Sequence, residues 1–93
     1  MKLFYTPEAV DDLVRLRTFI EDKNPGVAHR IAKAIQRDIQ QLKLSPYIGV
    51  EVDEASDPQT VRDLILGNYI VRYLVNAIEI FILRVWHHKG NRL

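Results

Sequence analysis

The sequence predicts an α+β fold, in which two antiparallel helices pack on one face of an antiparallel β-sheet of three or four strands. Two observations predict it. In the first half of the chain, apolar residues recur at steps of three and four, which indicates helices. In the second half, three runs rich in Ile, Val, Leu, Tyr and Phe lie close together, which favours strands. The expected order of elements is β-α-α-β-β-β, within one domain that spans residues 1–93.

A short strand, Lys2 to Tyr5, is expected at the start of the chain and is followed by a helix. The helix start is marked by Thr6, whose hydroxyl can cap it, and by Pro7, which suits the first helical position. The apolar residues of this helix form a stripe that is broader than a two-layer core needs. Part of the helix is therefore available to another molecule.

The segment Asn24 to Gly26 ends the first helix and begins the second, with Asn24 as its cap. This connection is so short that the two helices must form an antiparallel hairpin. The second helix ends at Leu44 to Pro46, and a loop is expected from Pro46 to Thr60. Three apolar residues are expected to pin this loop to the core: Tyr47, Ile48 and Val50.

A three-stranded antiparallel meander is predicted between Val61 and His88. Gly67-Asn68 is a turn dipeptide that tolerates positive φ and closes a hairpin, and Asn76 marks a second tight connection. The strands between these turns contain the apolar runs Leu64 to Leu66, Tyr69 to Val75 and Ile78 to Trp86.

The last strand of the meander is apolar on both faces. Alternation along a strand places Ile78, Ile80 and Ile82 on one face, and Glu79, Phe81, Leu83 and Val85 on the other. A strand with one wet face alternates between apolar and polar residues, so this strand is expected to be central and covered on both sides. The helices supply one cover. The other face is either loosely covered or contacts a bound partner, and the sequence leaves both alternatives open.

The composition excludes several classes of protein. There is no cysteine, so disulfides and thiolate metal sites are excluded, and the three histidines lack carboxylates at ligand spacing. No metal and no cofactor is expected. The longest apolar run, Ile80 to Leu83, is far shorter than a membrane span, which predicts a cytoplasmic protein. The net charge of +1 argues against a bulk nucleic-acid coat, yet the region from Arg84 onward contains three cations and no acid.

Several segments, in this order and spacing, resemble the RelE/ParE family of toxins. They are Phe4 to Ala9 with Asp12-Leu13 after it, Leu42 to Gly49, Arg62 to Leu64, Asn68 to Tyr73, and Ile82 to His88. The resemblance covers nearly the whole chain. It implies the toxin of a type II toxin–antitoxin system with the fold described above, held inactive in a hetero-oligomer by a small cognate antitoxin that wraps its surface.

The family resemblance implies two alternative activities. ParE-like members poison DNA gyrase without catalysis of their own, whereas RelE-like members are ribosome-dependent endoribonucleases that cut mRNA. The ending Arg84 to Lys89 is more similar to ParE-like chains, and nothing aromatic follows Trp86, where RelE-like nucleases usually have a tyrosine. A gyrase inhibitor is therefore favoured over a ribonuclease. A third alternative is a family member that has lost toxicity and only binds its antitoxin.

The basic end of the last strand and the tail are expected to contact the target. The expected target-binding residues are Arg62, Arg72, Arg84, His87, His88, Lys89 and Arg92. In the ribonuclease alternative, five of these would be catalytic: His87 and His88 as acid and base, with Arg72, Arg84 and Arg92 around the phosphate. Neighbours on a strand point to opposite faces, so at most one of the two histidines would line a given cleft. A plain alternative for Arg62 and Arg72 is pairing with acids such as Asp63 or Glu79.

The surplus apolar residues of the first helix are expected to bind the antitoxin. They are Val10, Leu13, Leu16 and Phe19. The antitoxin is expected to be an acidic and apolar segment, which adds either an extended strand or a helix in a groove.

Overall fold

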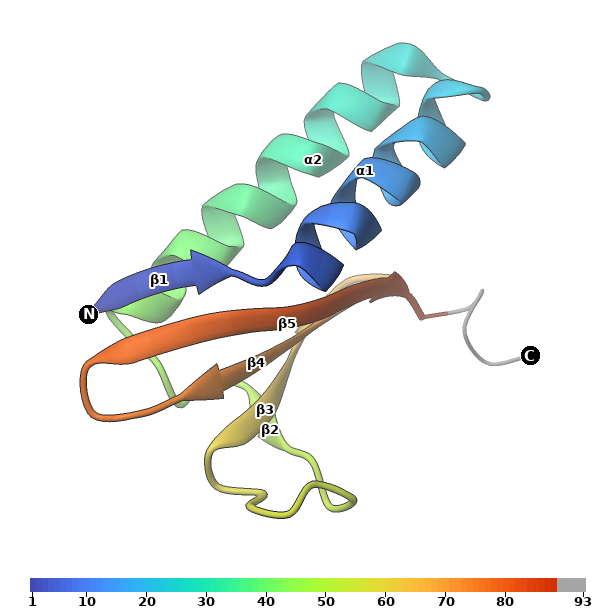
Figure 1. Cartoon of the computed structure of the whole chain (residues 1–93). Coiled ribbons are helices and arrows are strands. Elements are labelled where there is room, and N and C mark those ends of the chain that lie inside the picture. Colours follow the sequence, from blue (N-terminus) through green and yellow to red (C-terminus); the bar gives the residue numbers. More distant parts are fainter. Residues whose placement is uncertain (89–93) are drawn as a thin grey trace.

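The computed structural model describes residues 1–88, in which two helices lie on one face of a five-stranded sheet (Figure 1). The elements are β1 (Lys2–Tyr5), α1 (Pro7–Glu21), α2 (Pro25–Gln40), a single 3-10 turn (Gln41–Lys43), β2 (Val50–Glu51), β3 (Val61–Leu66), β4 (Tyr69–Val75) and β5 (Glu79–His87). The predicted α+β fold is confirmed.

The sheet has the strand order β1-β5-β4-β3-β2. All neighbours are antiparallel except β1 and β5, which are parallel, with Leu3 opposite Ile80. The sheet is therefore mixed and has five strands in the described chain, instead of the three or four mainly antiparallel strands that were expected. The additional strand, β2, pairs Val50 with Asp63 in a segment that was expected to be a loop. Two residues are too few to produce a recognisable alternation.

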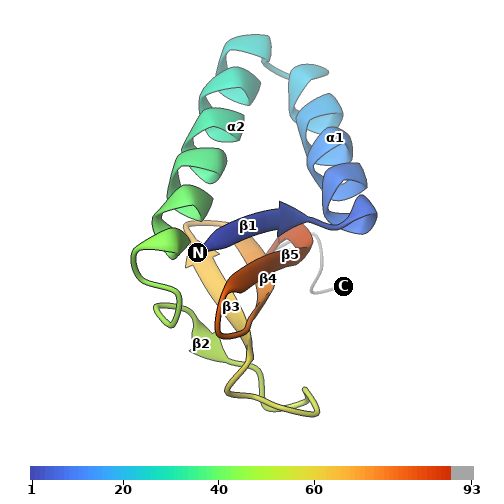
Figure 2. The ribbon, with the colours of Figure 1, turned by 60° about the vertical axis from the view of Figure 1, so that its left-hand side comes forward.

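Local side chains determine where the helices and the hairpins begin and end. Thr6 Oγ1 accepts a hydrogen bond from the backbone N–H of Ala9 at 3.1 Å, and Asn24 Oδ1 accepts one from Val27 at 3.2 Å. Gly67 has φ of +62°, the conformation that the turn between β3 and β4 requires. Figure 2 shows that the connection between α1 and α2 lies at the end of the molecule opposite the loop between β2 and β3.

The core lies between the helices and the sheet. Its largest fully buried side chains are Tyr73, Ile39, Leu42, Ile80, Ile82, Val71 and Val75. At about 25 cal/mol per Å² of buried apolar surface, each aliphatic side chain in this list stabilises the fold by about 1.5–3 kcal/mol, before the loss of conformational entropy is counted. The core therefore joins the second helix to β4 and β5, the central strands of the sheet.

A β-bulge in β5 changes the side-chain pattern that was expected. Tyr73 pairs with Ile82 but Arg72 pairs with Arg84, so Leu83 is an extra residue on this strand. As a result Val85, expected on the face opposite Ile82, is 2% exposed in the core together with Ile82. That expectation was wrong because alternation counts residues and takes no account of an inserted one.

The two ends of β5 further define its place in the sheet. β5 is central, between β1 and β4, as predicted. Ile78, however, is 69% exposed in the turn before the strand and is not part of the core. On the outer face, Phe81 stacks on Phe4 of β1 with ring centroids 5.4 Å apart, and Phe4 stays 41% exposed. The outer face is therefore apolar and open at this edge.

The loop after α2 is held by residues other than those expected. Tyr47, Ile48 and Val50 are all more than half exposed, whereas Val52 is buried. The buried Tyr73 hydroxyl donates to the backbone oxygen of Pro46 at 2.7 Å and accepts from the N–H of Gly49 at 2.9 Å. A tyrosine of β4, distant in sequence, thus anchors the loop, and the expectation for its three apolar residues was wrong.

Candidate functional site

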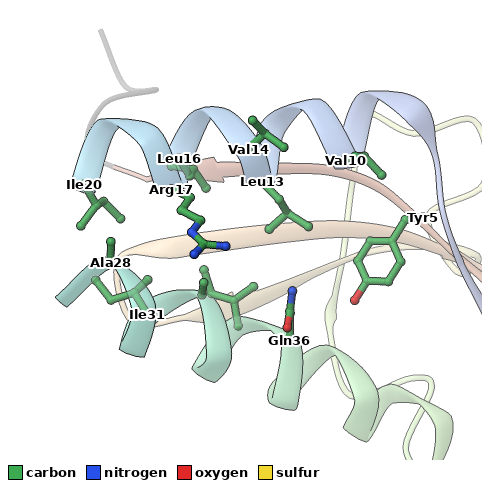
Figure 3. Close-up of a pocket in the computed structure, with 12 residues that line it drawn as sticks. Tyr5, Val10, Leu13, Val14, Leu16, Arg17, Ile20, Ala28, Ile31 and Gln36 are labelled. Atoms are coloured by element: carbon green, nitrogen blue, oxygen red, sulfur yellow. The ribbon is translucent and has the colours of Figure 1, made fainter. Parts of the chain in front are cut away.

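An apolar groove runs between α1 and α2, and we call it the interhelical groove (Figure 3). Its volume is about 320 Å³. Twelve residues line it: Tyr5, Val10, Leu13, Val14, Leu16, Arg17, Ile20, Ala28, Ile31, Ala32, Ile35 and Gln36. Three of the four residues expected to bind an antitoxin, Val10, Leu13 and Leu16, therefore lie together. Val14, which is 61% exposed, belongs to the groove and was not predicted, although its position four residues after Val10 could have indicated it.

A second hollow lies on the other side of α1, where this helix meets the end of β5. We call it the α1–β5 pocket, and its volume is also about 320 Å³. It is lined by Asp12, Arg15, Leu16, Phe19, Arg84, Val85, Trp86 and His87. Phe19 thus lies apart from the other three apolar residues of its expected set, and next to residues that were expected to contact the target. The structure brings two different expected roles into one pocket.

The wall of the α1–β5 pocket is built around the buried carboxylate of Asp12. Arg84 donates two hydrogen bonds to it, from Nε at 2.8 Å and from Nη2 at 3.1 Å, and the backbone N–H of Val85 donates a third at 2.9 Å. Arg15 lies 3.5 Å from the same carboxylate. Burial by itself raises the pKa of Asp12, but the hydrogen bonds from Arg84 and Val85 and the two positive charges outweigh it and lower this pKa. Asp12 is therefore ionised at neutral pH, and both of its oxygens accept hydrogen bonds.

Arg72 is paired in the same way on the outer face of the sheet. Its Nε and Nη2 donate to the two carboxylate oxygens of Asp63 at 2.8 and 3.0 Å, and these bonds raise the pKa of Arg72. The guanidinium also lies over the ring of Trp86, 5.2 Å from its centre. Pairing with Asp63 was one of the two alternatives that the sequence left open for this arginine.

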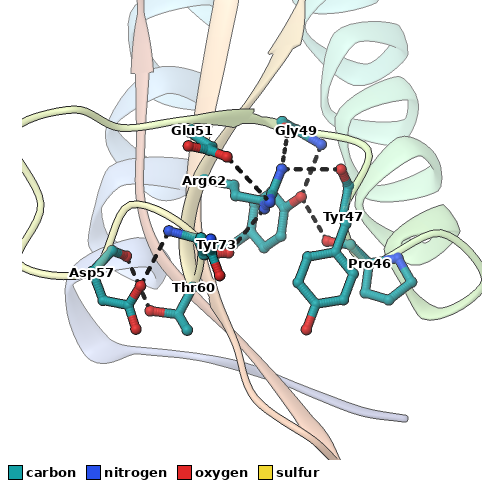
Figure 4. A network of polar contacts seen from close by, with 9 residues as sticks. Pro46, Tyr47, Gly49, Glu51, Asp57, Thr60, Arg62 and Tyr73 are labelled. Carbon is teal, nitrogen blue, oxygen red and sulfur yellow. Dashed lines mark hydrogen bonds and ion pairs between the residues drawn. The ribbon is translucent and has the colours of Figure 1, made fainter.

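Arg62 is directed into the loop and not towards the end of β5 (Figure 4). Its guanidinium donates to the backbone oxygens of Gln59 at 3.0 Å and Gly49 at 2.9 Å, and Glu51 lies 3.9 Å away. It also lies over the ring of Tyr47, 5.0 Å from its centre. These contacts join the loop to β3, so the side chain of Arg62 has a structural role.

The two histidines lie at the C-terminal end of β5. The ring of His87 meets that of Tyr69 edge to face, with centroids 5.1 Å apart, and His87 also lines the α1–β5 pocket. The backbone N–H of His88 donates to the oxygen of Asn68 at 2.6 Å. His88 is not among the residues that line this pocket. Two further expected target residues, Lys89 and Arg92, lie outside the described residues.

The geometry also bears on metals and membranes. Within residues 1–88, no group of three or more His, Asp or Glu side chains is arranged to hold a metal ion. None of the helices in this part of the chain combines the length and the apolar character needed to cross a membrane.

The fold is similar to solved toxin–antitoxin structures. A chain of a chromosomal ParDE system from P. aeruginosa superposes with a TM-score of 0.76 at 23% identity and covers 94% of this chain and 95% of that one. A chain of the RelB–RelE antitoxin–toxin complex from Methanococcus jannaschii gives 0.57 at 24% identity, with 94% and 92% covered. A conserved hypothetical protein from Helicobacter pylori gives 0.56 at 17% identity, with 96% of both chains covered. A search of curated proteins finds no match.

These similarities define the class of protein, because two helices on a five-stranded mixed sheet are the RelE/ParE-like fold. Residues 3–92 match the model of the family described as the ParE toxin of type II toxin–antitoxin systems. The chain therefore belongs to the ParE toxin family, and a toxin of such a system has a cognate antitoxin as its partner.

Proposed function

We propose that this ParE-family toxin acts in the cytoplasm by inhibiting DNA gyrase, and that the end of β5 and the tail that follows it contact this target. The match to the ParE family over nearly the whole chain supports this activity over RNA cleavage. The expected contact residues at this edge are Arg84, His87, His88, Lys89 and Arg92. Arg72 is opposite Arg84 in the sheet register, and on this ground we include it in the proposed contact surface.

The observation that supports the proposal most is the pairing of the sheet arginines. A ribonuclease needs cations that are free to stabilise the phosphate in the transition state. Arg72 and Arg84 each place two nitrogens on a carboxylate, and Arg62 donates to backbone oxygens of the loop. The charge of Arg72 is therefore largely compensated within the fold, and Arg84, which stays 55% exposed, is held in a fixed orientation by Asp12. This arrangement favours a protein-binding surface over a catalytic phosphate site.

One observation favours the ribonuclease alternative. The α1–β5 pocket contains both His87 and Arg84, an acid–base group next to a cation. If the chain cleaves RNA, we expect this pocket to be its catalytic site. A third alternative, an antitoxin-binding member without toxicity, keeps the interhelical groove and loses the function of the β5 end.

For the antitoxin, we propose binding in the interhelical groove through Val10, Leu13 and Leu16. The groove is lined mainly by aliphatic side chains of both helices, and a helix with an apolar face is the partner that such a groove accepts. Because the antitoxin binds only the folded toxin, it is expected to raise the melting temperature.

The test of the target uses purified toxin with gyrase and supercoiled plasmid, beside a ribosome-dependent mRNA cleavage assay. Lys89→Ala/Arg92→Ala is expected to lose gyrase inhibition by about tenfold or more, since interface contacts of this kind determine affinity. The matched control is Arg30→Ala/Lys33→Ala, which removes two cations from the exposed face of α2 and is expected to inhibit gyrase normally.

The possible results separate the three activities. If mRNA is cut on the ribosome and gyrase is unaffected, the gyrase proposal fails. His87→Ala is then expected to abolish the cleavage. If neither activity is present and the antitoxin still binds, the chain is a non-toxic member of the family.

A further inference from the structure

The α1–β5 pocket has a composition that the interhelical groove lacks. Phe19 contributes an aromatic ring that is 61% exposed, and Trp86 and Leu16 add apolar surface. Arg15 and Arg84 have side chains that are 71% and 55% exposed. Aromatic residues and arginine are the side chains most often found at the centre of protein interfaces.

The charge of the pocket is unbalanced at the surface. Among the described residues that line it, the one acid is Asp12, which is 4% exposed; its carboxylate accepts three hydrogen bonds from Arg84 and the N–H of Val85 and lies 3.5 Å from Arg15. Asp12 holds the Arg84 guanidinium through Nε and one N–H of Nη2. A guanidinium has five N–H donors, so three remain for a further acceptor. The pocket therefore presents oriented cations and no accessible acid among the residues that line it.

We propose that the α1–β5 pocket binds an acidic segment of the toxin's protein target. A carboxylate of the segment accepts hydrogen bonds from Arg84 and Arg15, and a large apolar side chain packs against Phe19 and Trp86. An arginine that is already oriented by a buried acid loses little side-chain entropy on binding, which favours a carboxylate at this position. This proposal rests on the proposed function in that the target is a protein.

The occupant is the target and not the antitoxin for two reasons. The pocket ends at His87, from which the chain continues directly into the basic residues of the proposed target edge. The interhelical groove, with its aliphatic lining, lies on the other side of α1 and accommodates a different partner. One helix thus separates two surfaces of different chemistry.

Two arginines on α1 provide a matched test, because Arg15 lines the pocket whereas Arg17 lines the groove (Figure 3). Arg15→Glu and Phe19→Ala are expected to weaken gyrase inhibition by about tenfold or more and to change the affinity for the antitoxin by less than about twofold. Arg17→Glu is expected to weaken binding of the antitoxin and to leave gyrase inhibition nearly unchanged. All three side chains are more than half exposed, so thermal unfolding is expected to show folded proteins.

Growth arrest without the antitoxin is measured for each variant, so that failure of the pocket and failure of the gyrase proposal can be distinguished. If wild type inhibits gyrase, and Arg15→Glu and Phe19→Ala inhibit it equally well, the pocket proposal is overturned and the gyrase proposal is retained. If wild type does not inhibit gyrase, the gyrase proposal fails, and growth arrest is then used to test the pocket proposal. If mRNA is also left uncut on the ribosome, arrest that is lost in Arg15→Glu and Phe19→Ala but kept in Arg17→Glu supports the pocket proposal, and equal arrest overturns it. Cleavage of mRNA overturns it as well, because the pocket is then expected to be a catalytic site.

Two further results also count against the pocket. A loss of antitoxin affinity in Arg15→Glu, with target inhibition unchanged, assigns the pocket to the antitoxin and overturns the proposal. A wild-type chain that causes no growth arrest overturns both proposals.

Discussion

Asp12 of α1 and Arg84 of β5 are 72 residues apart in the sequence and are joined by two hydrogen bonds of 2.8 and 3.1 Å. The same carboxylate accepts from the backbone of Val85, which lies on the part of β5 that extends beyond the pairing with β1. Asp12 therefore attaches the first helix to the open edge of the central strand. It also orients the arginine of the α1–β5 pocket.

Removal of the Asp12 carboxylate is expected to destabilise the fold. Asp12→Ala leaves the N–H of Val85 without its partner and removes the carboxylate that holds Arg84, which costs about 1–3 kcal/mol in the free energy of unfolding. Urea denaturation measures this change. Asp11→Ala is the matched control, because this neighbour is exposed, and it is expected to change stability by less than about 0.5 kcal/mol. Equal stability of the two variants would contradict the role given to Asp12.

The lowered pKa of Asp12 makes the stability depend on pH in the acid range. In the unfolded chain an aspartate has a pKa of about 3.9, so below this pH the unfolded state binds a proton more readily than the folded state. The stabilisation is fully present above about pH 4 and decreases as the pH falls towards the lower pKa of the folded state. Urea titrations between neutral and acid pH are expected to show a shallower acid decrease for Asp12→Asn than for wild type. An equal decrease of stability with falling pH in both proteins would contradict this role of Asp12.

Gly49 is expected not to tolerate a side chain. A Cβ atom there would lie 2.8 Å from the Tyr73 ring and hydroxyl and 2.9 Å from the backbone oxygen of Asp63. Gly49→Ala must displace the anchor of the loop, at a cost of about 1–3 kcal/mol. At Gly26 the nearest atom is 3.6 Å away, and Gly26→Ala in α2 is expected to stabilise the protein by about 0.5–1 kcal/mol. Thermal unfolding is expected to show a lower melting temperature for Gly49→Ala and a higher one for Gly26→Ala.

A charge in the interhelical groove is expected to block the antitoxin. Val14 is 61% exposed, so Val14→Glu is tolerated by the fold but would bury a carboxylate against the apolar face of a bound helix. The affinity for the antitoxin is expected to fall by about a hundredfold, measured by calorimetry. Ile78→Glu, at a site that is 69% exposed in the turn between β4 and β5, serves as control. If both variants bind equally well, the antitoxin does not use the groove.

The sequence predicts the local structure of this protein well. Thr6, Asn24, Gly67 and Asn76 each indicate the boundary of an element, because each acts through hydrogen bonds or backbone angles within a few residues of itself. The resemblance to the RelE/ParE family was carried by short segments spread along the chain, and the match over residues 3–92 confirms it. The order of elements and the class of fold were therefore accessible from the sequence.

The surfaces were predicted only in part. The spacing of Val10, Leu13 and Leu16 identified one side of the groove, because residues three and four apart share a helical face. Phe19 follows the same spacing from Leu16, yet it lies in the α1–β5 pocket. Leu16 borders both hollows, so the apolar stripe passes from one side of the helix to the other at this residue. A helical stripe describes one helix, and it does not specify which neighbouring element each part of the stripe meets.

By itself, the sequence determined the helices, the hairpins and the family of this protein. Only the tertiary structure decided the parallel pairing of β1 with β5, the bulge that moves Val85 into the core, and the burial of Asp12 against Arg84. The physical reason is the range of the interactions. Caps, turns and alternation act between residues close in the chain, whereas strand pairing and ion pairs over 72 residues depend on how complete elements pack.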